Sequence, residues 1–492
     1  MNKPNTTSRD HSTRRSMARK GGALGSAGLL AGGATTALLA AFAMPASATT
    51  LTVDSTGDGV ADATHCTNGT VGDCTLRDAL LAASAGDSIT FDSAATGTIA
   101  LTQGELGFSS AVSIVGPGAS SLTVDGNGQS RVFEVSSSIT GDVAISGLTI
   151  TGGVLSSGND DGAGIEMSHQ GNVTLDGVVV SGNQAAGIVG GAVFSNIGNV
   201  SVTNSVISGN TAATAAGLGF FNYSGTATLD SSTVEGNTAT VTADGGFSVY
   251  GPNSFTMTNS TISGNSAATF AGGFSVAASS SSYIYNSTIA NNTAGVGGGI
   301  VIGQSAQMKI VMSTISGNSS TDSAPVGNYV AAGGIAADRS SEVYLYGVIL
   351  SGNTSVFMMA ISDMGFANLG STLGLVDTHH SVLGNITGMT LYSEANVYST
   401  DPGLAALADN GGPTKTMALL SGSVAIDAGP NPVPSFTGNQ FDQRGDGYAR
   451  ITGSSSDIGA FEFGSRPIPP TTTTTVPGGN PSTDPVAPAF TG

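Results

Sequence analysis

Residues 254–265 read SFTMTNSTISGN, residues 281–292 read SSYIYNSTIANN, and residues 307–318 read QMKIVMSTISGN. Apolar and polar residues alternate in each segment, which is typical of a β-strand with one buried face. Segments of this kind end at Asn183, Asn210, Asn237, Asn265, Asn292, Asn318 and Asn353. The spacing is 26 to 28 residues except for the last interval of 35. A repeat of this period predicts a solenoid.

Each repeat contains three short segments with strand composition. Apolar residues stand eight and three positions before the final asparagine of every repeat, and a third segment often follows a glycine pair such as Gly245-Gly246. One turn cannot bury its apolar face alone, so stacked turns would form a continuous core. We therefore predict an all-β fold, a single-stranded right-handed parallel β-helix with three strands and about 27 residues per turn.

The asparagine that ends each repeat is called the ladder asparagine below. Stacked asparagine side chains are expected to hydrogen-bond from turn to turn, as they do in cross-β assemblies. The recurring glycines indicate corners where the backbone is left-handed or where two turns approach closely.

A helix is predicted near the N-terminal end of the β-helix. Residues 74–83 read CTLRDALLAA, with Thr75 as N-cap and Asp78 completing a capping-box pattern. An amphipathic helix at this place would cover the open end of the apolar core. Cys74–Ala79 resembles the CSLREA motif of secreted bacterial β-helix proteins, with Thr75 in place of serine and Asp78 in place of glutamate.

A second resemblance covers the C-terminal part. The segments ADNGGPT (408–414), SVAIDAG (423–429), DQRG (442–445) and DIGAFE (457–462) resemble the C-terminal module of choice-of-anchor β-helix proteins. The run GGAV at 190–193 is similar to the repeats of polymorphic outer-membrane proteins. These resemblances imply a surface or secreted β-helix protein and no single activity.

The chain divides into five predicted parts. Residues 1–48 form a signal peptide cleaved before Thr49, residues 49–110 a CSLREA-like cap with the first coils, and residues 111–395 the β-helix repeats. Residues 396–464 form the choice-of-anchor-like module and residues 465–492 a Pro/Thr-rich disordered tail. A basic region and an Ala/Gly-rich apolar run precede Ala46-Ser47-Ala48. The pair Arg14-Arg15 leaves twin-arginine and general secretion both open.

The two cysteines, Cys66 and Cys74, predict a disulfide, because a close pair in an exported protein is typically oxidised. A metal site would need more ligands than these, so no metal site and no cofactor are predicted. The acidic composition is compatible with weak calcium binding, but the sequence contains no calcium-binding loop with the required spacing.

The net charge excludes some partners. The chain carries a formal charge of −19, and removal of residues 1–48, with six basic residues and one acidic residue, leaves −24. Such a surface makes nucleic acid a poor partner. The remaining chain contains no apolar run long enough for a transmembrane helix. A cell-surface or extracellular glycan or protein is the expected partner.

Asp176 and Asp230 are the candidates for catalysis. Both stand seven residues before a ladder asparagine on the outward strand face, with one turn between them. Their backbones would lie about 9–10 Å apart, and leaning side chains could reach the inverting-glycosidase separation of about 6.5–9.5 Å. Solvated strand-face aspartates are the alternative. Asp160-Asp161 is expected to serve turn geometry.

Tyrosines gather in two outward columns of the same strand, nine and seven residues before the ladder asparagine. Their faces could stack on sugar rings or on an apolar partner surface. The alternative is that β-propensity alone places tyrosines on a sheet surface. The predicted ligand-binding residues, beside the insertion at 319–332, are Tyr283, Tyr285, Lys309, Tyr344 and Tyr346.

The sequence thus favours a secreted or cell-surface, noncatalytic β-helix protein with an adhesive or structural role and a glycan as candidate ligand. The expected location is extracellular, including association with the cell wall. The alternative is a carbohydrate-active enzyme, a polysaccharide hydrolase or lyase of the pectin-lyase-like fold.

Overall fold

The computed structural model describes residues 48–467 with short gaps. The gaps are residues 158–160, 188, 196–197, 222–224, 251–253, 278–279, 358–361, 367–374 and 387–390. Most of the predicted signal peptide and most of the predicted tail therefore lie outside the described residues.

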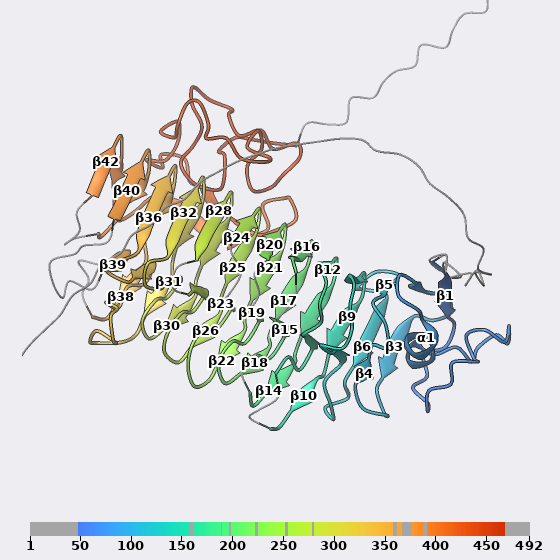
Figure 1. Ribbon diagram of the computed structural model, residues 1–492. Helices are drawn as coiled ribbons and strands as arrows, with labels where there is room; N and C mark the ends of the chain where they lie inside the picture. Colours follow the sequence, from blue (N-terminus) through green and yellow to red (C-terminus); the bar gives the residue numbers. More distant parts are fainter. Residues whose placement is uncertain are drawn as a thin grey trace, which may run out of the picture. The chain divides into compact units, whose positions relative to one another are not determined.

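The predicted parallel β-helix is confirmed, with strands stacked turn upon turn (Figure 1). Sheet A, with 13 strands, comprises β1 (Thr50–Val53), β2 (Ser88–Phe91), β5 (Ser113–Val115), β8 (Val143–Ser146), β12 (Val173–Asp176), β16 (Val200–Thr203), β20 (Thr226–Asp230), β24 (Ser254–Thr258), β28 (Ser281–Tyr285), β32 (Gln307–Val311), β36 (Glu342–Tyr346), β40 (Leu375–His379) and β42 (Leu391–Glu394). Sheet B, with 12 strands, comprises β3 (Gly97–Ala100), β6 (Leu122–Asp125), β9 (Thr149–Thr151), β13 (Val179–Ser181), β17 (Val206–Ser208), β21 (Thr233–Glu235), β25 (Thr261–Ser263), β29 (Thr288–Ala290), β33 (Thr314–Ser316), β37 (Ile349–Leu350), β41 (Val382–Leu383) and β43 (Val397–Tyr398). Sheet C, with 10 strands, comprises β4 (Leu106–Gly107), β7 (Phe133–Val135), β11 (Ile165–Met167), β15 (Ala192–Ser195), β19 (Leu218–Phe221), β23 (Phe247–Tyr250), β27 (Phe274–Val276), β31 (Ile300–Ile302), β35 (Ile335–Ala337) and β39 (Met364–Phe366).

The structure adds a fourth, shorter ladder to the three predicted ones. Sheet D has 8 strands of two residues, and each of them except β10 directly follows a ladder asparagine. Its strands are β10 (Val154–Leu155), β14 (Gln184–Ala185), β18 (Thr211–Ala212), β22 (Thr238–Ala239), β26 (Ser266–Ala267), β30 (Thr293–Ala294), β34 (Ser319–Ser320) and β38 (Thr354–Ser355). Two residues are too few to show an alternating pattern, so this ladder could not be predicted from the sequence.

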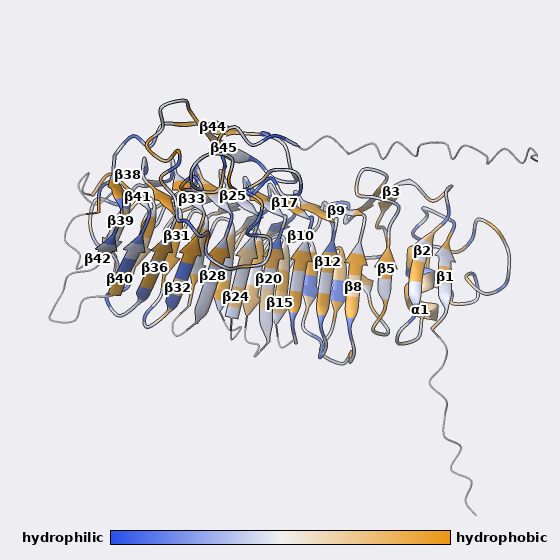
Figure 2. Ribbon diagram, turned by 90° about the horizontal axis from the view of Figure 1, so that it is seen from above, coloured by the Kyte–Doolittle hydropathy of each residue, from blue (hydrophilic) through white to orange (hydrophobic). Residues whose placement is uncertain are grey.

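The inward side chains form one apolar core along the turns. A single cluster of buried residues extends from Val53 to Ile386. In sheet C its members include phenylalanines from successive turns, and the rings of Phe247 and Phe274 stack with centroids 4.6 Å apart. Figure 2 shows hydrophobic positions recurring along the stacked strands. Each turn therefore covers the apolar face of its neighbours.

The ladder asparagines form the predicted chain of hydrogen bonds. The main-chain N–H and the Nδ2 of Asn210 each donate to Oδ1 of Asn237 at 3.0 Å. Nδ2 of Asn210 also donates to the carbonyl oxygen of Val180 at 3.0 Å. The pattern continues to Asn353, whose acceptor is the carboxylate of Asp363. The residue before each ladder asparagine is left-handed, as at Gly236 with φ +64°, which explains the recurring glycine.

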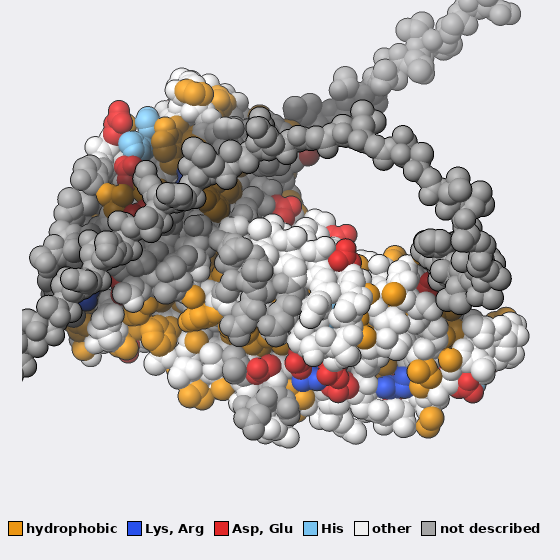
Figure 3. All heavy atoms as spheres, in the orientation of Figure 1, with side chains coloured by type: hydrophobic (Ala, Val, Ile, Leu, Met, Phe, Trp, Pro, Cys, Tyr) orange, Lys and Arg blue, Asp and Glu red, His pale blue; other side chains and the backbone are white. Residues whose placement is uncertain are grey.

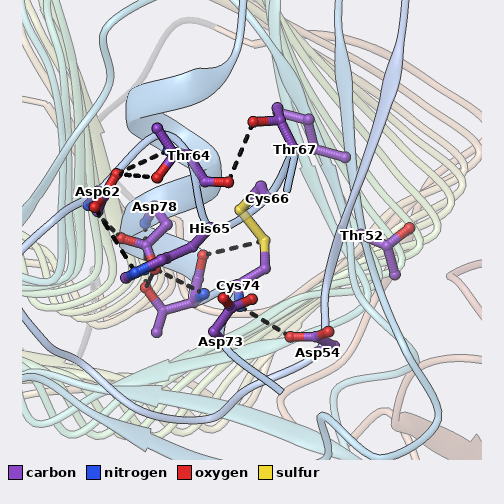
Figure 4. The surroundings of a disulfide bond; sticks show 12 residues. Thr52, Asp54, Asp62, Thr64, His65, Cys66, Thr67, Asp73, Cys74 and Asp78 are labelled. Atoms are coloured by element: carbon purple, nitrogen blue, oxygen red, sulfur yellow. Dashed lines mark hydrogen bonds and ion pairs between the residues drawn. A yellow bond between two sulfur atoms is a disulfide. The ribbon is translucent and has the colours of Figure 1, made fainter. Parts of the chain in front are cut away.

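The predicted N-terminal helix and disulfide are both present (Figure 4). Helix α1 (Leu76–Ala82) begins after Thr75, and Thr75 and Asp78 form the expected capping box. Leu76 and Leu80 are buried in the main core, so the helix covers its N-terminal end. The Cys66–Cys74 bond ties the preceding loop to the start of this helix.

Loss of the disulfide should loosen the N-terminal end alone. In the Cys74→Ser variant we expect hydrogen exchange to accelerate in β1 and β2 and to stay unchanged in β24 and β28. The physical reason is that closing so short a loop contributes about 2–3 kcal/mol locally. Hydrogen-exchange mass spectrometry measures this effect, and a uniform loss of protection along the β-helix would contradict it. The intact wild type should also be two hydrogens lighter than the reduced chain.

Beyond β43, the last strand of sheet B, residues 399–464 fold back along that sheet and contain the antiparallel pair β44 (Leu404–Ala408) and β45 (Thr416–Leu419); this segment is called the C-terminal module below. Gln443 is fully buried at the contact and bonds to the hydroxyl groups of Thr261 at 2.8 Å and Thr288 at 2.6 Å. The N–H of Ala460 donates to the hydroxyl of Thr314 at 3.1 Å. These three threonines begin β25, β29 and β33, so the module spans several turns. No helix among the described residues is long and apolar enough to cross a membrane.

The insertion at 319–332 lies at a different place from the one predicted. Tyr329 packs edge-on against Phe270, with ring centroids 5.9 Å apart. Ala332 joins a small buried cluster with Val301 and Ala336, on the outer side of sheet C. The insertion therefore covers sheet C, and the expectation that it lies beside the tyrosines of sheet A is wrong.

Near this cluster, the buried carboxyl of Asp244 should make stability depend on pH. It accepts hydrogen bonds from Ser248 and, at 2.5 Å, from Ser275, and burial raises its pKa to about 7. The native chain then holds a proton that the unfolded chain releases near pH 4. The contribution of this proton to the free energy of unfolding is therefore full below pH 4 and is lost as the pH rises toward 7. Urea unfolding of wild type and Asp244→Asn at pH 5 and pH 8 measures it.

We expect the wild type to lose more stability than Asp244→Asn between these two pH values, by on the order of 2–4 kcal/mol. Other buried acids such as Glu462 titrate in both proteins, so they cancel in the comparison. Equal slopes for the two proteins would show that Asp244 does not carry this proton.

Candidate functional site

The two tyrosine columns have the predicted register. In sheet A, Tyr283 pairs with Lys309 and Lys309 with Tyr344, while Tyr285 pairs with Val311 and Val311 with Tyr346. The next turn extends the first column by Asp377 and the second by His379. Successive parallel strands are about 4.8 Å apart, so Tyr283 and Tyr344 stand about 10 Å apart along the sheet.

A groove of about 520 Å³ lies over these columns. It is called the tyrosine groove here, and its lining includes Tyr283, Gln307, Lys309, Tyr344, Tyr346, Asp377 and His379. Figure 2 shows hydrophilic positions on β32, β36 and β40, the strands that supply most of this lining. On the face drawn in Figure 3, charged side chains form a few small groups among uncharged residues. The tyrosine groove thus combines aromatic, cationic and anionic side chains.

Two tyrosines present their rings to the groove under different constraints. Tyr283 is 36% exposed and lies parallel to Tyr285, with centroids 6.3 Å apart. Tyr344 donates its hydroxyl proton to Glu342 at 3.0 Å, and Glu342 also accepts from Gln307 at 2.8 Å. Burial and this carboxylate raise the pKa of Tyr344, which stays a neutral donor at physiological pH. The Gln307–Glu342 pair therefore fixes the Tyr344 hydroxyl.

Lys309 stands between the two rings. Its side chain is exposed, and within the described ranges it forms no ion pair. An ammonium group in this position can donate hydrogen bonds to a ligand without first breaking one inside the protein.

The other two predicted tyrosines stack on aromatic side chains of other segments of the chain. Tyr285 stacks on Phe436 of the C-terminal module with centroids 5.1 Å apart, and Tyr346 stacks on His379 and His380 at 5.4 and 5.9 Å. Val311, between them in the column, is fully buried. Tyr283, Tyr344 and Tyr346 thus line the groove, Tyr346 with its ring stacked on the two histidines, while Tyr285 supports the ring of Tyr283 and is not part of the lining.

His379 has acidic partners that the sequence analysis did not find. Its Nε2 lies 2.8 Å from Asp377 and its Nδ1 lies 3.4 Å from Glu394. Asp377 is two residues away on the same strand, so both side chains point to the same face. The spacing was visible in the sequence, but the irregular repeat after Asn353 concealed the strand.

Asp176 and Asp230 occupy the predicted column two strands apart. Asp176 accepts hydrogen bonds from Thr203 at 2.8 Å and Asn204 at 2.9 Å. Asp230 accepts from Thr258 and from Asn259 at 3.1 Å. Both carboxylates thus accept hydrogen bonds from the following turn. This structural role explains the presence of the two aspartates without catalysis. Their catalytic role remains a prediction.

A charged cluster on sheet C was not predicted. Arg131 is buried and lies 2.8 Å from Glu105 and 2.5 Å from Glu166, and it donates to the carbonyl oxygen of Asp161 at 3.1 Å. Burial raises the pKa of both glutamates. Asp160, considered with Asp161 above, lies outside the described residues. Where the structure is described, no three His, Cys, Asp or Glu side chains are arranged to hold a metal ion.

Comparisons with known proteins concern the fold. Residues 190–369 match the family model described as a right handed beta helix region, which confirms the predicted handedness. The crystal structure of pectate lyase Pel9A is similar with a TM-score of 0.47 and 14% identity, over 84% of this chain and 96% of that chain. A search of curated proteins finds no match. The central turns of this chain are therefore a right-handed β-helix.

Proposed function

We propose that this chain is an exported, noncatalytic β-helix protein that binds a glycan in the tyrosine groove and acts as an adhesive or structural component. The observation that carries the proposal is the pair of accessible rings, Tyr283 and Tyr344, on either side of Lys309. The register of three successive strands holds these residues in place, so the groove exists without a ligand.

The groove has the chemistry of a sugar-binding surface. The faces of Tyr283 and Tyr344 can stack on the C–H faces of sugar rings, and the spacing of about 10 Å between their strands leaves room for a chain of linked rings. Gln307, Lys309 and Asp377 line the same groove and can bond to sugar hydroxyl groups. A flat apolar partner would not need this density of polar groups.

Export is supported by two features. Ala46-Ser47-Ala48 has the small residues of a signal-peptidase site, and the chain contains the Cys66–Cys74 disulfide. The resemblance to CSLREA and choice-of-anchor proteins agrees with a surface location.

Catalysis is the competing proposal, with a polysaccharide hydrolase or lyase as the enzyme class. Its structural basis is the Asp176/Asp230 column, whose carboxylates are engaged by Thr203, Asn204, Thr258 and Asn259. A general acid or base must reach the scissile bond, and these hydrogen bonds point instead to the neighbouring turn. Binding is therefore the better-supported function.

The double variant Tyr283→Thr/Tyr344→Thr tests the groove. Threonine occupies the equivalent outward position in β24, so the fold should tolerate it. We expect binding to cellohexaose, xylohexaose, mannohexaose or chitohexaose, whichever the wild type binds, to weaken about tenfold or more, because two stacking contacts are lost. Isothermal titration calorimetry measures the change.

Tyr398→Thr is the matched control, since Tyr398 is 61% exposed and belongs to sheet B. It should bind as the wild type does. Unchanged binding by a folded double variant, or no binding of any hexasaccharide by the wild type, would overturn the proposal. Reproducible cleavage of a polysaccharide that Asp176→Asn abolishes would establish the enzyme instead.

A further inference from the structure

The C-terminal module reaches the tyrosine groove through one aromatic side chain. The ring of Phe436 stacks on Tyr285 at 5.1 Å and 19°, and Tyr285 lies parallel to Tyr283 at 6.3 Å and 6°. Three rings therefore form a continuous row that begins in the module and ends in the groove. Of the three, Tyr283 lines the groove.

The segment that carries Phe436 is held firmly to the β-helix. The carbonyl oxygen of Phe441 accepts a hydrogen bond from Nδ2 of Asn286 at 3.4 Å. Asn286 directly follows β28, the strand that carries Tyr283 and Tyr285. Arg450 is 1% exposed and donates to Oδ1 of the same Asn286 and, at 2.9 Å, to the carbonyl oxygen of Gly459. Both the side-chain nitrogen and the side-chain oxygen of Asn286, at the end of β28, therefore bond to the C-terminal module.

The loop itself is ordered by local hydrogen bonds. Asn439 donates its side-chain N–H to the carbonyl oxygen of Pro434 at 3.0 Å and its main-chain N–H to that of Phe436 at 3.2 Å. The N–H of Arg450 donates to the carbonyl oxygen of Gln440 at 2.9 Å. The position of the Phe436 ring therefore follows from the docking of the module.

We propose that residues 434–450 of the module form a positioning arm for the tyrosine groove, which sets the orientation of Tyr283 through the stacked ring of Tyr285. The inference rests on the proposed glycan binding and adds that affinity depends on Phe436, which is not part of the groove lining. Phe436 is a positioning residue: it acts on the ligand through two other rings.

The stacking of Phe436 on Tyr285 is not the contact that attaches the module to the β-helix. Other residues make polar contacts that hold the module on sheet B: Gln443, in the same arm, bonds to Thr261 and Thr288, and Ala460 bonds to Thr314. Phe436 is only half-buried, and the partner of its ring is a tyrosine of sheet A. The contact thus links the module to the groove, in addition to the bonds that hold the module in place.

The test compares three folded variants of the full chain. Phe436→Ala removes the stack, Phe436→Tyr restores an aromatic ring, and Phe463→Ala removes a module phenylalanine that is 38% exposed and has no ring contact with the groove tyrosines. Tyrosines labelled with ¹³C in the ring report the environment of Tyr283, assigned through Tyr283→Phe. Calorimetry with the four hexasaccharides reports affinity.

We expect the Tyr283 resonance to shift in Phe436→Ala and to return in Phe436→Tyr, with no change in Phe463→Ala. Affinity should fall about threefold to tenfold in Phe436→Ala and recover in Phe436→Tyr, as expected for loss of one aromatic pair. An unchanged Tyr283 resonance in Phe436→Ala would overturn the inference, whether or not any hexasaccharide binds.

The two proposals fail in different ways. If Tyr283→Thr/Tyr344→Thr loses binding and Phe436→Ala keeps it, the arm is overturned and the glycan site stands. If the Tyr283 resonance responds to Phe436→Ala but the wild type binds none of the hexasaccharides, glycan binding is overturned, and the positioning of Tyr283 by the arm stands.

Discussion

The hydrogen bonds between ladder asparagines are the constraint on which the rest of the structure depends. From Asn210 to Asn353, each ladder amide oxygen accepts two N–H bonds from the preceding turn, and each Nδ2 donates both to a carbonyl oxygen of that turn and to the next side chain of the ladder. A slip of one residue between turns would break this chain and would also move apolar side chains to the outer face. The ladder therefore fixes the register, and with it the alignment of every outward column. Its last acceptor, Asp363, is a carboxylate that also accepts from the N–H of Asn385 at 2.7 Å.

The tyrosine groove is a consequence of that register. Tyr283, Lys309 and Tyr344 become neighbours because strands from three turns are paired without offset. The groove then acquires two contributions from outside these turns. Asp377 and His379 extend the columns from β40, and the C-terminal module supports Tyr285 through Phe436. A binding surface on a solenoid can thus combine a periodic part with a part that the repeat does not contain.

The sequence was informative where the repeat is regular. The spacing of asparagines predicted the ladder and the column of tyrosines, the capping-box pattern predicted the helix, and the close cysteine pair predicted the disulfide, because each depends on a local pattern or a fixed period. The sequence did not predict the contacts that form when segments far apart in the chain pack together. The contact of Phe436 with Tyr285 joins residues about 150 positions apart, the threonines that receive the module look like ordinary strand residues, and the insertion at 319–332 could have turned toward either neighbouring sheet. His379 was missed because the repeat lengthens after Asn318 and loses its Gly-Asn signature after Asn353.

The most direct test of the ladder compares the urea unfolding of Asn237→Ala and Asn199→Ala. Both asparagines link successive turns by amide hydrogen bonds, but Asn237 is fully buried and Asn199 is exposed. Loss of the Asn237 side chain leaves two donors of Asn210 and the carbonyl oxygen of Ile207 without their partner. The account predicts a loss of about 2–5 kcal/mol for Asn237→Ala and less than about 1 kcal/mol for Asn199→Ala. Equal losses in the two variants would contradict it.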